Sequence, residues 1–401
     1  MKRTISIVGG GACALMLACC LDPAKFIVNI YESNAAAGRK FLVAGQGGLN
    51  ITHSEDASTF INKYTPNSFI KEAFSTFSNQ DLVNWLEGIS IETYTGSSGR
   101  IFPIASLKPV TVLNAFLDKI KKNGFTFHFH HLFNGFDSNN QLLFLVDGKE
   151  KAIASDLVIF CMGGASWPVT GSTGSWSSFL KLKNITINPF QASNCSFEIK
   201  WPQLLIEKIE GKILKNVSFS CSDVSCLGEA VITKTGIEGS GVYPLSPQIR
   251  EQIQHNGSAE IYLDLKPQLK KEKIIEKIHS LKGKSNFSEE LKRQLNLPSY
   301  QLQILKTYIS KEDFQNAEKL ANQIKHLRLK IASCGPIENA ISTVGGIDLS
   351  EIDADFMLKK LPNHFAIGEM LDYDAPTGGY LLQSCFSMAF YLAKHLNKKF
   401  Y

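Results

Sequence analysis

The sequence lacks the cysteine pattern of a disulfide-rich or zinc-binding protein. Its nine cysteines include no CxxC pair, so we expect reduced and mostly buried thiols. Cys221 and Cys226 come closest to metal-ligand spacing, but no Cys/His pair at zinc-finger spacing follows them. We therefore expect two strand thiols at these positions and no metal site.

An excess of charge of one sign is also missing. Lys and Arg number 42 and Asp and Glu 37, which leaves a net charge of +5 over 401 residues. Proteins that bind polyanions through charge usually carry a larger and more clustered basic excess. The composition therefore predicts a small-molecule substrate and no nucleic-acid partner.

No hydrophobic run reaches the length of a membrane-spanning helix. The stretch Ile5–Leu21 has no charged residue, but it falls short of the roughly 18 residues that a spanning helix needs. Because Lys2 and Arg3 precede it and Leu17-Ala18-Cys19 resembles a lipoprotein cleavage site, a signal peptide is an alternative. Three consecutive glycines from Gly9 interrupt the helix that a signal peptide requires. We expect no membrane insertion and a cytoplasmic protein.

The same N-terminal residues match the opening of a dinucleotide-binding fold. Thr4–Val8 predicts a short strand, Gly9–Ala14 matches GxGxxA, and Ala12–Cys20 predicts a helix. A second strand, Phe26–Tyr31, ends at Glu32, which lies 23 positions after Gly9. A strand, glycine turn, helix, strand and acid in this order favour dinucleotide binding over a plain βαβ unit.

Each position of this motif has a physical role. The first glycine allows the sharp turn, the second lets the pyrophosphate approach the backbone, and the small third residue lets the helix pack on the strand. Amides at the start of the helix face the phosphates, and the acid accepts hydrogen bonds from the ribose. The expected contacts are Gly9, Gly11, Ala12, Cys13, Ala14, Glu32 and Ser33.

Three later segments favour FAD over NAD. Gly38–Asn50 is a basic and glycine-rich loop, and the strand-like Leu157–Cys161 ends in Met162-Gly163-Gly164. Near the C-terminus, Phe365–Glu369 predicts a strand and a turn, and Pro376–Tyr380 opens an apolar helix. Taken singly, these segments also fit a flexible loop, a buried turn and a core helix with a glycine cap.

In the FAD interpretation the loop amides hold the pyrophosphate or the ring, and the late helix N-terminus faces the N1/O2 edge of the isoalloxazine. Its partial positive charge would stabilise the negative charge of reduced flavin. These segments add the following contacts: Arg39, Lys40, Gly47, Gly48, Leu49, Asn50, Met162, Gly163, Gly164, Gly368, Glu369, Gly378, Gly379 and Tyr380. Leu132 is placed beside the adenine.

Motifs spread over nearly the whole chain carry a family resemblance. They are Gly38–Glu55, Gly96–Pro103, Gly163–Pro168, Thr235–Tyr243, Ile341–Gly346 and Gly368–Leu382. Through them the chain resembles the YhiN/BaiN-type (BaiN/RdsA-like) NAD(P)/FAD-dependent flavoproteins. The resemblance implies noncovalently bound FAD in a domain that is split by an insertion.

The expected fold class is α/β. A Rossmann-like FAD-binding domain of the two-dinucleotide-binding-domain flavoprotein type is expected at 1–195 plus 331–401. A β-rich insert, 196–268, and a helical segment rich in Lys and Glu, 269–330, would interrupt it.

Two further absences narrow the chemistry. Residues 38–50 contain no cysteine, so disulfide reduction through a redox pair after the first βαβ unit is not expected. Gly239-Ser240-Gly241 lacks the third small position of a second fingerprint, so no dedicated NAD(P)H domain is expected. A nicotinamide donor would then dock transiently.

The catalytic residues cannot be assigned from the sequence. The histidines of residues 128–131 fit strand packing better than a metal cluster, and a turn-capping role is the alternative for His53. Candidate proton donors by motif membership are His53, Arg100, Asp372 and Tyr380.

The sequence predicts an FAD-dependent oxidoreductase that acts on a small, apolar molecule, with NAD(P)H as a candidate electron donor. The resemblance to BaiN-type proteins implies reduction of a carbon–carbon double bond, but it does not define the substrate pocket. The alternatives are an FAD-dependent RNA-modifying protein, suggested by the lysine-rich helical segment, and a non-catalytic FAD-binding protein.

Overall fold

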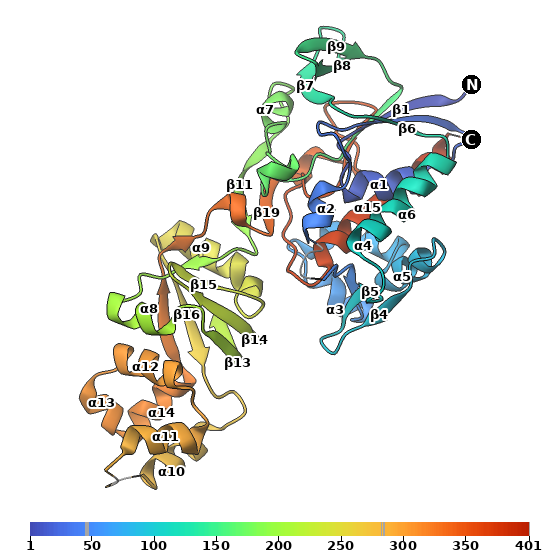
Figure 1. Cartoon of the computed structure of the whole chain (residues 1–401). Helices are drawn as coiled ribbons and strands as arrows, with labels where there is room; N and C mark the ends of the chain where they lie inside the picture. The colour runs from blue at the N-terminus through green and yellow to red at the C-terminus, as the bar shows by residue number, and fades with distance from the viewer. Residues whose placement is uncertain (45–47, 282, 284, 401) are drawn as a thin grey trace. The chain divides into compact units, whose positions relative to one another are not determined.

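The computed structural model describes residues 1–44, 48–281, 283 and 285–400, and the chain forms two compact units (Figure 1). Unit 1 comprises Met1–Ala192 and the chain from Ile337 onward, and unit 2 comprises Ser193–Pro336. Unit 2 is therefore an insertion into the chain of unit 1.

A five-stranded parallel sheet lies at the centre of unit 1. Its strand order is β20-β10-β1-β2-β6, and every neighbouring pair is parallel. The consecutive residues Ile5, Ser6 and Ile7 of the central strand are fully buried, as expected for a sheet covered on both faces. The strands are β1 (Arg3–Val8), β2 (Phe26–Tyr31), β6 (Thr126–His128), β10 (Leu157–Phe160) and β20 (His364–Ala366).

Helix α1 (Ala12–Cys20) contains no charged residue and is buried from Cys13 to Cys19, which is typical of a core helix. It packs against α15 (Tyr380–Lys399), where the Cys13 thiol donates to the carbonyl oxygen of Cys385 at 3.2 Å. Helix α6 (Pro109–Lys122) lies beside them (Figure 1). The apolar N-terminal run is thus explained by its central place in unit 1.

The remaining elements of unit 1 form smaller layers. A three-stranded sheet has the order β3-β5-β4, another has the order β7-β8-β9, and β11 pairs with β19. The strands are β3 (Thr52–His53), β4 (Thr93–Thr95), β5 (Arg100–Pro103), β7 (Leu132–Phe136), β8 (Leu142–Val146), β9 (Lys149–Ile153), β11 (Ile187–Ser193) and β19 (Ser342–Ile347). The helices are α2 (Arg39–Ala44), α3 (Ala57–Ile61), α4 (Asn67–Thr76), α5 (Asn79–Glu87) and α7 (Ser177–Lys181).

Unit 2 is built on a seven-stranded antiparallel sheet of order β17-β16-β13-β14-β15-β12-β18. The strands are β12 (Phe197–Glu198), β13 (Ile213–Cys221), β14 (Val224–Thr233), β15 (Gly236–Glu238), β16 (Ala259–Asp264), β17 (Leu327–Ile331) and β18 (Ser333–Cys334). Two helices, α8 (Gln203–Ile209) and α9 (Ser246–Asn256), belong to the same unit.

Between the neighbouring strands β16 and β17, the described residues form five helices. They bury aliphatic residues such as Ile274, Leu291 and Leu320 on one face and expose Lys and Glu on the other. They are α10 (Lys271–His279), α11 (Phe287–Leu295), α12 (Ser299–Tyr308), α13 (Lys311–Gln315) and α14 (Ala317–Lys325). The helical segment therefore leaves and rejoins the insert sheet at adjacent strands.

The structure confirms the expected fold class, a Rossmann-like FAD-binding domain interrupted by a second part with its own antiparallel sheet. Two local expectations differ. The strand-like pattern does not extend through His130, whose φ of +57° turns the chain two residues after β6 ends. Helix α15 starts at Tyr380 because Gly378 and Gly379 have φ values of +113° and +91°.

In the part of the chain that the structure describes, no helix is both long enough and apolar enough to cross a bilayer.

Candidate dinucleotide-binding site

The turn between β1 and α1 requires glycine for two different reasons. Gly9 has a φ of +100°, and a Cβ on it would lie 2.5 Å from the carbonyl oxygen of Cys161. A Cβ on Gly11, by contrast, would lie 3.9 Å from the same carbonyl oxygen of Cys161. The protein itself therefore needs Gly9, whereas Gly11 leaves open space beside the start of α1.

The carboxylate of Glu32 lies against this turn at the end of β2. Its Oε2 accepts a hydrogen bond from the Gly10 amide at 2.8 Å, and its Oε1 accepts from the Asn34 amide at 2.8 Å. The Ser33 hydroxyl donates to Oε1 at 3.1 Å. The side chain is thus fixed where the ribose of a dinucleotide is bound in Rossmann folds. Asn34, which the sequence analysis missed, holds it there.

A cluster of hydrogen-bonded polar side chains lies at the ends of β10 and β20. Lys40 Nζ, on α2, lies 2.8 Å from Glu369 Oε2 and 2.8 Å from Ser166 Oγ. Glu369 Oε1 also accepts from the Thr343 amide at 3.1 Å. A Cβ on Gly164 would lie 2.0 Å from Thr343 Oγ1, so the close approach requires glycine. Ser166 and Thr343 were missed as individual residues, although both lie within motifs of the resemblance.

The N-terminus of α15 packs closely against β3. A Cβ on its cap residue, Gly379, would lie 2.6 Å from the Cα of Thr52. The hydroxyl of the next residue, Tyr380, donates to Glu55 Oε2 at 2.7 Å. Burial, and then the hydrogen bond to Glu55, raise the pKa of Tyr380, so this phenol stays protonated at neutral pH. Glu55 was not among the predicted site residues.

Two buried acceptors at this end have no partner within the described part of the chain: Asn50 Oδ1 and Thr52 Oγ1. The Asn50 side-chain amide is oriented by Nδ2, which donates to the carbonyl oxygens of Thr52 at 2.8 Å and Ile101 at 3.0 Å. A buried polar atom without a hydrogen bond costs about 1–3 kcal/mol. These two atoms therefore fit a bound polar ligand, such as the ring edge of a flavin.

The ring of His53 is held in place on both sides. Its Nδ1 accepts from the Glu55 amide at 3.2 Å, so Nε2 carries the proton that is donated to the Ser98 carbonyl oxygen at 2.9 Å. The ring stacks on Tyr380 with centroids 5.6 Å apart. His53 therefore orders the loop that carries Glu55 and supports Tyr380.

The Asp372 carboxylate joins the two strands β11 and β19. Its Oδ1 accepts from the Gly345 amide at 2.8 Å, and its Oδ2 accepts from Asn188 Nδ2 at 2.6 Å. Arg100, at the start of β5, lies near the glycine pair instead: its Nε would be 3.7 Å from a Cβ on Gly378. Of these two candidates, only Arg100 lies next to the N-terminus of α15.

Further predicted residues border the same sheet edge. Gly368 has a φ of +89°, and a Cβ on it would lie 3.2 Å from Cys13 Sγ. The carbonyl oxygen of Gly163 accepts from the Trp176 indole at 3.0 Å, and Met162 lies two residues after the end of β10 at Phe160. The ends of β1, β10 and β20 thus bring these three segments together, as expected for a ligand site of a parallel sheet.

The remaining predicted residues lie around this edge. Arg39 is exposed and donates to the Asn34 side chain. Leu132 is 47% exposed at the start of β7, next to His131, whose amide donates to the Glu32 carbonyl oxygen at 3.0 Å. The loop residues Gly48 and Leu49 are exposed and buried, respectively, and Gly47 lies outside the described residues.

Among the described residues, no group of three or more His, Cys, Asp or Glu side chains could hold a metal ion. Two of the histidines of residues 128–131 pack against aromatic rings. His128 stacks on Tyr31 with centroids 4.8 Å apart, and its Nε2 lies 2.9 Å from Asn29 Oδ1; His131 lies edge-on to Phe144.

Two curated relatives match this chain over nearly its whole length. The ribosomal RNA dihydrouridine synthase of Haemophilus influenzae is 23% identical over 400 residues, which is 98% of each chain. The protein of the same name from Escherichia coli is 22% identical over 395 residues, which is 97% of each chain.

Solved structures show the same fold at low identity. The 3-ketosteroid-Δ4-(5α)-dehydrogenase of Rhodococcus jostii has a TM-score of 0.50 and 10% identity, over 99% of this chain and 96% of that one. The 3-ketosteroid Δ1-dehydrogenase of Sterolibacterium denitrificans has a TM-score of 0.50 and 11% identity, over 99% and 100%. The family model of the HI0933-like protein Rossmann domain matches residues 3–395. The resemblance found in the sequence is thereby confirmed, and the chain belongs to the HI0933-like family.

Proposed function

We propose that this protein binds FAD noncovalently at the carboxyl edge of the unit 1 sheet and works as a flavin-dependent reductase. The central observation is the glycine turn closed by Glu32, together with the two unpartnered acceptors at the other end of the site. A Rossmann-like FAD-binding fold supports this assignment.

Different residues of the chain would contact different parts of the cofactor. Glu32 would accept from the adenosine ribose, and the first amides of α1 after Gly11 would face the pyrophosphate. Lys40 and Glu369 would contact the chain between phosphate and ring. Asn50 and Thr52 would contact the polar edge of the ring.

When bound, FAD supplies two-electron hydride chemistry. The first turn of α15 would add fixed partial positive charge near Gly379 and stabilise negative charge on a reduced ring. Tyr380 keeps its proton and orients the carboxylate of Glu55. Lys40, fixed by Glu369, supplies a cation that needs no rearrangement when charge develops.

For the substrate we propose a uridine in ribosomal RNA. Its support is the full-length similarity to two proteins named ribosomal RNA dihydrouridine synthase. The distribution of charge agrees with this. Lys and Arg outnumber Asp and Glu by 21 to 16 in residues 193–336, whereas the rest of the chain has 21 of each. The whole excess of positive charge therefore lies in unit 2, although the net charge of the chain is low.

The proposed reaction saturates the C5=C6 bond of uracil. One hydride and one proton are added, and NAD(P)H is the proposed source of the two electrons. The second candidate substrate is the small, apolar molecule expected from the sequence as a whole. Both candidates use the same cofactor site, so the substrate must be identified by its product.

Cofactor binding can be tested with Thr52→Val, which removes only the unpartnered hydroxyl. We expect the purified wild-type protein to be yellow, or to become yellow with FAD, and the variant to bind FAD about tenfold more weakly, as for one lost hydrogen bond in a buried site. Because Thr52 Oγ1 has no protein partner, the thermal stability of the FAD-free variant should not fall. A wild-type protein that takes up no FAD would refute the proposal.

The substrate can be tested with an unmodified ribosomal RNA transcript, FAD-loaded protein and NADPH or NADH under anaerobic conditions. Mass spectrometry of the digested RNA should show a uridine heavier by two hydrogens. If the flavin is reduced by the nicotinamide but no dihydrouridine forms, the RNA substrate is refuted and a small molecule is favoured. Glu32→Ala serves as the variant expected to lose both FAD and product.

A further inference from the structure

The helical part of unit 2 encloses a hollow that is separate from the cofactor site. It has a volume of about 960 Å³ and is lined by residues from α10 to α14 and the segments between them. This is at the upper end of the roughly 300–1,000 Å³ range of ligand pockets and exceeds the volume of one nucleotide. We refer to it below as the unit 2 hollow.

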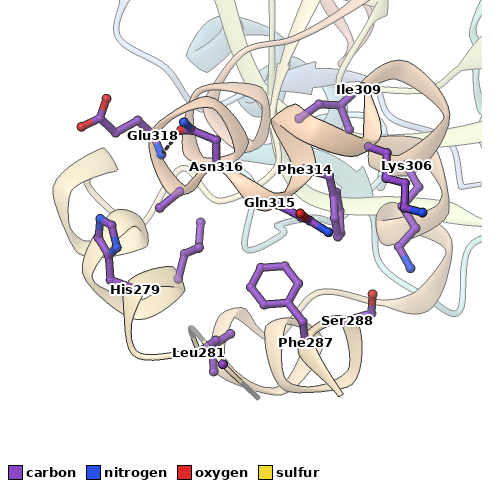
Figure 2. Close-up of a pocket in the computed structure, with 14 residues that line it drawn as sticks. His279, Leu281, Phe287, Ser288, Lys306, Ile309, Phe314, Gln315, Asn316 and Glu318 are labelled. Carbon is purple, nitrogen blue, oxygen red and sulfur yellow. Dashed lines mark hydrogen bonds between the residues drawn. The ribbon is translucent and has the colours of Figure 1, made fainter. Parts of the chain in front are cut away.

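Two aromatic rings face this space. Figure 2 shows Phe287 extending from α11 and Phe314 from α13 toward the same opening. Their centroids are 5.8 Å apart and the rings are nearly perpendicular, at 82°. Both side chains are only partly buried, so each keeps ring surface that the protein does not cover. Partly exposed aromatic rings of this kind are platforms on which bases stack.

Cations border the same rings. Lys306 Nζ lies 5.4 Å from the centroid of the Phe314 ring, and Lys311 lines the hollow from the start of α13. Both lysines are exposed, and neither forms an ion pair with another described residue. Other lysines of these helices are neutralised: Lys319 pairs with Asp313 at 2.5 Å and Lys273 with Glu276 at 2.8 Å.

Groups that can read a base edge complete the lining. Gln315 points into the hollow between the rings, and His279 and Glu318 lie on the side away from Lys306 (Figure 2). The arrangement is therefore polarised. Phosphates would be attracted at Lys306 and Lys311, while Gln315 offers both a donor and an acceptor beside the rings.

From this arrangement we propose that the unit 2 hollow binds unpaired RNA, with a base on Phe287 or Phe314 and its phosphates at Lys306 and Lys311. The inference rests on the proposed RNA substrate and assigns a second contact site for it, outside the cofactor site. The basic excess of unit 2 and the two unneutralised lysines favour RNA. An acidic peptide would satisfy the lysines but would not use the two ring faces.

The test is fluorescence-anisotropy binding of a labelled oligouridine of about 12 nucleotides to the full-length, FAD-loaded, oxidised protein. For the double variant Lys306→Gln/Lys311→Gln we expect about tenfold weaker binding at low salt. The slope of log affinity against log salt should become shallower by about 1.4, because each lost contact to a single strand removes about 0.7. Lys273→Gln removes one charge elsewhere on these helices and should change affinity less than twofold.

Phe314→Leu tests stacking without adding or removing charge. We expect at least about fivefold weaker binding with the salt slope unchanged, because stacking does not release counterions. Circular dichroism and a melting curve verify that this variant is folded. If it is not, the double lysine variant, which changes exposed residues only, decides the question.

Three results would overturn the inference: wild-type affinity in the double lysine variant, wild-type affinity in folded Phe314→Leu, or equal competition by a poly-glutamate peptide of matched charge. The measurement uses no electron donor and forms no product. Failure to make dihydrouridine therefore does not affect the binding result. Unaffected binding in the variants would refute RNA binding at the unit 2 hollow but would not affect the proposed cofactor site.

Discussion

Lys40 and Glu369 are 329 residues apart in the chain, yet their charged groups meet at 2.8 Å beside the glycine turn. The side chains are 28% and 9% exposed, so the pair is largely shielded from water. The carboxylate also receives the Thr343 amide, and the ammonium donates to Ser166. One ion pair therefore ties α2 to the loops after β10 and β20.

Glu369→Gln should weaken both the fold and the cofactor site. It leaves the partly buried Lys40 without a counter-charge. Removing one partner of a buried pair costs about 3–5 kcal/mol, and less where a partner is partly exposed, as Lys40 is. We expect a Tm several degrees lower and weaker FAD binding, measured by melting and by fluorimetric titration. Lys319→Gln breaks the exposed pair with Asp313 and should shift the Tm by less than about 1 °C. Equal effects of the two substitutions would contradict this assignment.

Substituting alanine for Gly9 should affect the stability of the protein, whereas the same substitution at Gly11 should affect FAD binding. Gly9→Ala places a Cβ 2.5 Å from a backbone oxygen at a φ of +100°, so the protein itself should be destabilised by more than about 2 kcal/mol. Gly11→Ala meets nothing in the protein closer than 3.9 Å and should fold.

The methyl group of Gly11→Ala would, however, occupy the space that the pyrophosphate needs. We expect this variant to melt like wild-type protein in the FAD-free state but to bind FAD at least tenfold more weakly. Melting curves and FAD titrations of both variants separate the two effects. If Gly11→Ala binds FAD normally, the pyrophosphate does not lie over this turn.

The βαβ opening could be predicted from the sequence because its constraints are local. The turn glycine, the small residues of α1 and the acid after β2 lie within 24 consecutive residues, and each restricts the backbone or the packing of the next element. The start of α15 was placed correctly to within a few residues for the same reason, since the glycine pair at its cap has to precede it.

Pairings across the chain could not be predicted in this way. The motifs contain Glu55, Ser166 and Thr343, but no local pattern indicates that Glu55 meets Tyr380 or that Thr343 meets Glu369. The unit 2 hollow was missed because its two aromatic rings come from different helices, and the surrounding Lys and Glu residues resemble a solvated surface. Total charge was uninformative because one unit is neutral and the other basic.

Acid should destabilise unit 1 through His364. Burial lowers the pKa of this histidine below its ordinary value of 6.5. Its Nδ1 donates to the Pro362 carbonyl oxygen at 2.9 Å, so an added proton would enter at the buried and unpartnered Nε2. A lowered pKa in the folded state means that the unfolded chain takes up the proton first, so stability is full above about pH 6.5 and falls below it.

The measurement is Tm between about pH 7.5 and pH 5.5. His364→Phe keeps a ring against Phe160 and Phe136 but cannot be protonated, so its Tm should fall less over this range. His255→Asn changes an exposed histidine in unit 2 and should leave the pH profile of the wild-type protein intact. A His364→Phe profile as steep as that of the wild-type protein would assign the acid sensitivity to other groups.

Thiol reactivity should be greater at Cys334 than at Cys20, which is similarly exposed. A hydrogen bond from the Cys195 thiol lowers the pKa of Cys334, and the same bond raises the pKa of the donor. Cys20 has intermediate exposure like Cys334, but burial raises its pKa to about 12. Because the thiolate is the nucleophile, iodoacetamide at about pH 8 should modify Cys334 well before Cys20. Peptide mass spectrometry over time gives the order.

Substitutions of Cys195 test the hydrogen bond between the Cys195 and Cys334 thiols. Cys195→Ala removes the donor, so the pKa of Cys334 should rise and its alkylation should slow several-fold at about pH 8, with the difference shrinking as the pH rises through the pKa of the variant. Cys195→Ser keeps a donor of similar size and should preserve the fast reaction. If the alanine variant reacts faster than wild-type protein, access to the sulfur controls the rate, because removing a donor can only disfavour the thiolate.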